Sequence, residues 1–186
     1  MNTDELVRRL KLVDTPFIYY PSSLDTVNFT SGFKTSIKSQ VFPTLKQYIS
    51  DGKEFVVINN NTTGSAKTKG FGYLYTYSVA NELSKKIPVI VSREELQKAI
   101  ESNEADYYQT TDSILFVEGV SKDYDSYEKP EIRKFSNLLY ERVRWGHQTV
   151  LDVSDTNFLG NGAVTPFLYS YLMSMGAFVD MNEVIK

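Results

Sequence analysis

Four short runs of apolar residues recur along the chain, and loops or helical patterns separate them. They are Phe55–Ile58, Pro88–Val91, Ile114–Val117 and Thr149–Val153. Each is too short for a helix and is typical of a strand buried on both faces of a parallel sheet. A further run, Phe178–Met181, fits a fifth strand at an edge. Strands that alternate with helices predict an α/β fold, with helices on both faces of a mostly parallel sheet.

Capping residues and apolar spacing place the helices between these strands. Ser92 and Glu95 form a capping-box pattern, which starts a helix that ends near Ser102. The segment 31–49 repeats apolar residues about every four positions, so we expect a helix that is bent or broken before Pro43. Residues 105–112 are polar and acidic, and we interpret them as a linker.

Two more helices follow in the second half of the chain. Thr165 and Pro166 cap and start a last helix, apolar almost all round, which Gly176 ends. Pro130 suits the first turn of an earlier helix, whose apolar stripe is Ile132, Phe135, Leu139 and Val143. Four basic residues of that helix lie largely off its stripe: Arg133, Lys134, Arg142 and Arg144. They form either a solvated helix face or a surface that follows a nucleic-acid backbone.

The loop after the first apolar run contains an altered phosphate-binding pattern. Residues 61–68 read NTTGSAKT, and Gly64, Lys67 and Thr68 fit the loop backbone, the phosphate-binding lysine and the Mg²⁺-ligating hydroxyl. The two remaining glycines of the pattern are replaced by asparagine and alanine. A strand before the loop and a helical pattern after it indicate a nucleotide-binding frame. Lys67 and Lys69 either meet a phosphate, of ATP or of DNA, or remain solvated loop charges.

The 186 residues, 41% hydrophobic and 23% charged, are ordinary for one globular domain with a sizeable core. We expect an α/β domain over 31–186, preceded by a helix and arm over 1–30. The absence of cysteine and the single histidine, His147, argue against disulfides and against thiolate or histidine metal sites. A net charge of −3 argues against binding nucleic acid by bulk electrostatics. No run nears the roughly 20 apolar residues of a membrane span, so we expect a cytoplasmic protein.

The order of these segments resembles the ATPase domain of DnaC-type replicative helicase loaders and IstB-type transposition helpers, which are AAA+ proteins. The resemblance extends from about Leu24 to Met181 and rests on seven short matches in the same order. They are Ser23–Phe29, Ala80–Leu83, Ile87–Ile100, Ile114–Gly119, Phe135–Arg144, Thr149–Asp155 and Phe167–Met181. The resemblance implies a three-layer P-loop NTPase fold of the AAA+/RecA-like kind, with a mostly parallel five-stranded sheet.

The chain departs from the family's pattern at four places that serve catalysis. The loop is longer than a working one: either about five extra residues follow Lys67-Thr68, or Phe71-Gly72 replaces the lysine and hydroxyl. The strand that should end in an acidic pair ends in Glu118-Gly119, and Ser154 or Asp155 occupies the place of the sensor asparagine. The last helix contains no arginine, so the second sensor is missing. Glu118 and Asp155 are therefore candidate relics of a catalytic site.

We therefore expect a catalytically degenerate helicase-loader-like protein, a pseudo-ATPase encoded by a phage or mobile element. It would act in DNA replication by binding a replicative helicase, a helicase loader or another copy of itself, without a cofactor or metal. One alternative is an active loader that hydrolyses ATP with Mg²⁺, using Lys67, Thr68 and Glu118. Another is a single-stranded DNA binding protein that uses Lys67, Lys69 and nearby tyrosines.

Overall fold

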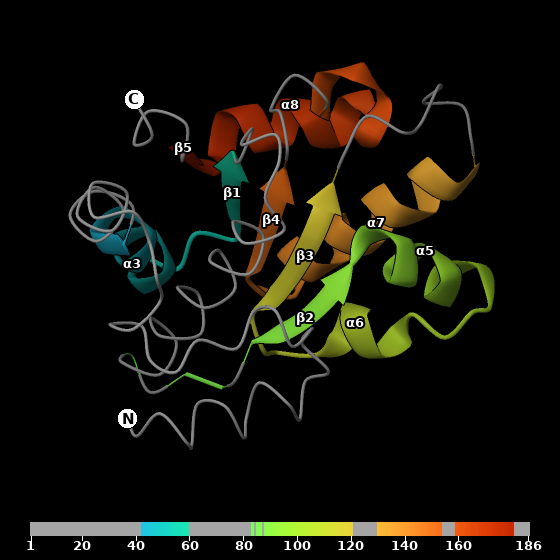
Figure 1. The fold of residues 1–186 in the computed structure, drawn as a ribbon, viewed down its shortest axis with the longest axis horizontal. Helices are drawn as coiled ribbons and strands as arrows, with labels where there is room; N and C mark the ends of the chain where they lie inside the picture. Colours follow the sequence, from blue (N-terminus) through green and yellow to red (C-terminus); the bar gives the residue numbers. More distant parts are fainter. Residues whose placement is uncertain are drawn as a thin grey trace, which may run out of the picture.

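A five-stranded parallel sheet forms the centre of the molecule (Figure 1). The computed structural model describes residues 42–59, 83, 85–86, 88–120, 130–153 and 159–180. The strands lie in the order β2-β3-β4-β1-β5, and every neighbouring pair is parallel. Their bounds are Phe55–Asn59 for β1, Val89–Ser92 for β2, Leu115–Val120 for β3, Thr149–Val153 for β4 and Ala177–Asp180 for β5. All five predicted strands and their parallel arrangement are confirmed.

Helices cover this sheet and connect its strands. They are α3 (Phe42–Ser50), α5 (Arg93–Glu101), α6 (Asp106–Thr110), α7 (Pro130–Arg144) and α8 (Pro166–Met175), with a π-helical turn, η3, at Leu159–Ala163. Pro43 lies in the first turn of α3, where a proline is tolerated. The linker predicted for 105–112 is wrong, because α6 occupies most of it. None of the helices in the described part of the chain is long and apolar enough to cross a membrane.

The predicted helix caps are present in the structure. The backbone N–H of Glu95 donates to Ser92 Oγ at 3.1 Å, and the backbone N–H of Ser92 donates to Glu95 Oε2 at 3.0 Å, which completes the capping box of α5. Thr165 Oγ1 accepts from the backbone N–H of Leu168 at the start of α8. Gly176 follows the last residue of α8, and a Cβ there would lie 2.4 Å from the carbonyl oxygen of Leu172, so this position favours glycine.

One row of valine and leucine side chains runs across the sheet in register. Val91, Val117, Leu151 and Val57 are successive partners from β2 to β1, and all are buried. Residues of α5, α7 and α8 complete the same core: Leu96, Phe135, Leu139, Leu168 and Leu172. The alternate side chains on the other face are buried too, among them Val56, Ile58, Phe116 and Val150, and α3 contacts β1 and β5. Burial on both faces explains the continuous apolar runs in the sequence.

Candidate functional site

The strands all end at the same edge of the sheet, which is where open α/β sheets bind their ligands. Asn59 ends β1 and is paired with Val153 at the end of β4 and with Asp180 at the end of β5. Val120 ends β3 and is also paired with Val153. The ends of β1, β3 and β4 therefore lie side by side, and residues at these positions belong to one candidate site.

The end of β3 is irregular at Glu118 and Gly119. The pairing of β3 with β4 shifts between Val117 and Val120, and Gly119 within this shift has φ of 72°. That left-handed conformation favours glycine over residues with a side chain. Glu118 is half-buried and pairs with Ser92 on the β2 side. The irregular strand end thus presents one carboxylate, from Glu118, followed by a glycine.

A second carboxylate, that of Asp152, lies in the neighbouring strand. Asp152 is 5% exposed and is paired with Ile58 in β1. Val117, the residue before Glu118, is paired with Leu151, the residue before Asp152. Both interact with other groups of the chain. Within the described ranges no three His, Cys, Asp or Glu residues are close enough to hold a metal ion.

The other predicted nucleotide-site residues, Gly64, Lys67, Thr68, Lys69 and Asp155, lie outside the described residues. Their roles remain predictions. Glu118 lies within the part of the chain that the structure describes, and it is one of the groups that ATP and Mg²⁺ require. Its carboxylate is of the kind that holds Mg²⁺ directly or through water. The fit of these described residues to the nucleotide is therefore partial.

The predicted nucleic-acid surface on α7 is wrong at Arg142. This side chain is 0% exposed and cannot contact DNA, whereas Arg133, Lys134 and Arg144 are exposed. The exposed Arg144 forms an ion pair with Glu141 at 2.8 Å. Arg142 follows Phe135 by seven residues, two helical turns, so it lies on the apolar stripe and not beside it. That spacing is the signal that could have revealed its burial from the sequence.

Five hydrogen bonds hold the buried guanidinium of Arg142 in place. Nη1 donates to the carbonyls of Tyr108 at 2.6 Å and Thr111 at 2.9 Å, and Nη2 donates to those of Ser113 and Gln148, both at 2.9 Å. Nε donates to Thr149 Oγ1 at 3.0 Å. Burial lowers the pKa of Arg142 to about 10, so it is charged at neutral pH. Arg142 therefore joins α6 and the segments that lead into β3 and β4.

Gln148, the residue before β4, makes a second connection at this end of the sheet. Its Nε2 donates to the carbonyls of Ile49 and Lys53, both at 3.1 Å, and its Oε1 accepts from the ammonium group of Lys85. Lys85 also donates to the carbonyl of Ile49 at 3.1 Å, and burial lowers the pKa of this lysine. These contacts fix α3 against β4 at the edge opposite the candidate site, so their role is structural.

The order of the strands, their parallel pairing and the helices on both faces define the three-layer α/β fold of P-loop NTPases of the AAA+ type. The crystal structure of DnaI shares this fold, with a TM-score of 0.59 and 14% identity over 88% of this chain and 89% of that one. The structure of AMPPCP-bound DnaA from Aquifex aeolicus shares it too, with a TM-score of 0.54 and 13% identity over 85% of this chain.

This chain spans about half of the DnaA structure, since the match covers 49% of it. No protein-family model and no curated protein sequence matches the chain. At these identities the two structures establish the fold, and the predicted fold class is confirmed.

Proposed function

We propose that this chain is a catalytically degenerate helicase-loader-like protein, a pseudo-ATPase, which acts in DNA replication by binding another protein. Its partner is a replicative helicase, a helicase loader or another copy of the chain. The AAA+ fold then serves as a platform, and its surface supplies the binding energy. We also propose that a phage or mobile element encodes it, that it works in the host cytoplasm, and that residues 1–30 form an arm on a domain spanning 31–186.

The observation that supports lost catalysis most directly is the end of β3. Phosphoryl transfer to water needs a residue that orients the attacking water beside the group that holds Mg²⁺. Glu118 is present, but the next residue is Gly119, with φ of 72°. A glutamate at position 119 would have to adopt the left-handed conformation, at a cost of about 1–2 kcal/mol. The strand end is therefore shaped for a glycine and not for an acidic pair.

The fold supports the assignment to replication. DnaI, a DnaC-like loader, matches over most of both chains, and DnaA was solved with the ATP analogue AMPPCP bound. The same comparison with DnaA favours the alternative of an active ATPase that uses Gly64, Lys67, Thr68 and Glu118. The burial of Arg142 removes one of the four basic residues of the predicted nucleic-acid surface on α7 and leaves Arg133, Lys134 and Arg144 exposed. The single-stranded DNA alternative depends instead on Lys67 and Lys69, and the net charge of −3 argues against it.

Nucleotide binding by the purified chain separates these functions. We expect a fluorescent ATP analogue with Mg²⁺ to show no saturable binding up to millimolar concentration, and we expect no phosphate release. Gly119→Glu should not create hydrolysis, because its backbone conformation is unfavourable for glutamate.

Micromolar binding that Lys67→Ala abolishes and Lys69→Ala preserves, together with phosphate release, would refute the proposal and establish the active ATPase. The two lysines lie two positions apart in the same loop, so Lys69→Ala controls for a general loss of positive charge.

A further inference from the structure

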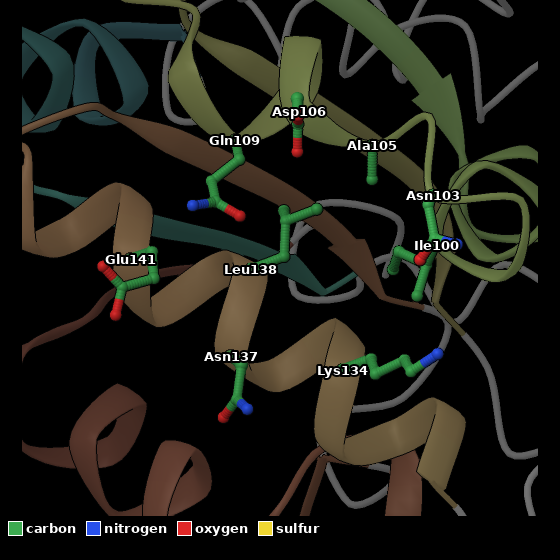
Figure 2. A pocket seen from close by; sticks show the side chains of 9 residues that line it. All are labelled: Ile100, Asn103, Ala105, Asp106, Gln109, Lys134, Asn137, Leu138 and Glu141. Atoms are coloured by element: carbon green, nitrogen blue, oxygen red, sulfur yellow. The ribbon is translucent and has the colours of Figure 1, made fainter.

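A groove of about 250 Å³ lies between α6, α7 and the C-terminal end of α5 (Figure 2). Its floor is apolar and consists of Ile100, Ala105 and Leu138, of which Ile100 and Leu138 are 6% and 4% exposed. Its walls are polar and come from α6, α7 and the turn between α5 and α6: Asn103, Asp106, Gln109, Lys134, Asn137 and Glu141. The groove is separate from the candidate nucleotide site, because α6 leads into the start of β3, whereas that site lies at the strand's end.

Most of the polar wall residues have no side-chain partner among the described residues. The side chains of Asn103, Asp106, Gln109, Lys134 and Asn137 make no hydrogen bond or ion pair with any other residue that the structure describes. Other surface lysines form ion pairs with carboxylates: Lys86 with Asp112 at 2.6 Å, and Lys98 with Glu94 at 2.9 Å. Within the described ranges, the groove therefore presents amide donors and acceptors without a side-chain hydrogen bond above an apolar floor.

The size and chemistry of the groove favour an extended peptide as its occupant. Its volume is below the roughly 300–1,000 Å³ of sites that enclose small molecules and cofactors. The amide side chains of Asn103, Gln109 and Asn137 can each donate and accept, which matches the alternating N–H and C=O groups of an extended backbone. Asp106 and Glu141 would repel the phosphates of a nucleic acid.

The charges of the groove indicate which charged residues such a peptide would contain and how far apart they would be. Lys134 and Glu141 are seven residues apart on α7, which places them about 10 Å apart along the helix axis. An extended chain covers that distance in about three residues. Glu141 already binds Arg144 at 2.8 Å, but a carboxylate has room to accept a second cation.

We propose that this groove binds an extended segment of a partner protein, with an acidic side chain against Lys134 and a basic side chain about three residues away against Glu141. The inference rests on the proposed function only in that the chain acts by binding another protein. It requires neither the presence nor the absence of nucleotide hydrolysis.

Selection from a random dodecapeptide library displayed on phage, with the full chain as bait, tests the proposal. We expect the selected peptides to share an acidic and a basic residue about three positions apart. Synthetic versions should bind the chain about tenfold more weakly after Lys134→Glu, which turns an attraction into a repulsion. Asn137→Arg should also weaken binding, because a longer side chain would enter the groove.

Arg133→Glu is the matched control, since it makes the same charge change at an exposed neighbour on α7 that does not line the groove. It should leave peptide affinity unchanged, and a peptide with lysine in place of its acidic residue should regain binding to Lys134→Glu. The proposal is overturned if the library yields no shared pattern, or if Lys134→Glu and Arg133→Glu weaken binding equally. ATP hydrolysis by the same preparation would refute the proposed loss of catalysis and leave the peptide result standing.

Discussion

Replacing Arg142 by methionine tests whether this buried arginine holds α7 to the segments that lead into β3 and β4. Methionine fills a similar elongated volume with an apolar, flexible side chain, so the variant removes hydrogen bonds and leaves little empty space. The carbonyls of Tyr108, Thr111 and Ser113 lose their donor from Arg142. The carbonyl of Gln148 keeps the backbone N–H of Leu115 at 3.1 Å.

The expected cost follows from these lost contacts. An unsatisfied buried acceptor costs about 1–3 kcal/mol, and the low end applies here because these three carbonyls are only partly buried. Three carbonyls and the hydroxyl of Thr149 therefore predict a loss of about 3–4 kcal/mol in the free energy of unfolding. That is a large fraction of the roughly 5–15 kcal/mol that stabilises a typical domain.

Urea unfolding followed by circular dichroism at pH 7 measures this loss. With a denaturant slope of about 2 kcal/mol per molar, Arg142→Met should lower the unfolding midpoint by about 1.5–2 M. Arg144→Met is the control on the same helix: its ion pair with Glu141 is largely exposed, with 62% and 32% exposed side chains, and should contribute less than about 1 kcal/mol. Equal midpoint shifts in the two variants would refute the structural role of Arg142.

Two further predictions concern helix ends and faces. Hydrogen bonds with Ser92 lower the pKa of Glu95, so Ser92→Ala should raise that pKa in an NMR titration and cost about 1 kcal/mol at pH 7. A carboxyl group whose pKa is lowered in the folded state stabilises the fold only while it is ionised, so the cost of Ser92→Ala should shrink as the pH falls through the folded-state pKa of Glu95. A Glu95 pKa that the substitution leaves unchanged would contradict the capping box. Leu168→Ala should cost about 2–4 kcal/mol in urea unfolding and Phe167→Ala less than about 1 kcal/mol, since they are 0% and 63% exposed; the reverse order would show that α8 presents its other face.

Features that depend on neighbouring residues were predictable from the sequence. The strands were evident because a strand buried on both faces needs a continuous apolar run. The starts of α5 and α8 were evident because the exposed N–H groups of a helix's first turn are bonded by side chains at most three residues away, here Ser92 and Thr165. The glycine that follows Glu118 is likewise given by the sequence, and the loss of an acidic pair at this place stays a prediction.

Features that depend on distant contacts were missed. Helix α6 has no side-chain cap of its own, and Arg142 bonds its Tyr108 carbonyl from 34 positions further along the chain. The same contact explains the error at Arg142, because an arginine at a helix surface and an arginine inside a core have the same sequence letter. Whether Arg142 is buried depended on which backbone carbonyls the fold places beside its guanidinium group.

The sequence by itself determined the alternation of strands and helices and the ends of two helices, because spacing and capping act over a few residues. Only the tertiary structure decided the order of the strands, the left-handed backbone of Gly119 and the burial of Arg142. It also decided the convergence of three helices on one groove. Each of these follows from contacts between elements far apart in the chain, whose geometry a local pattern does not contain.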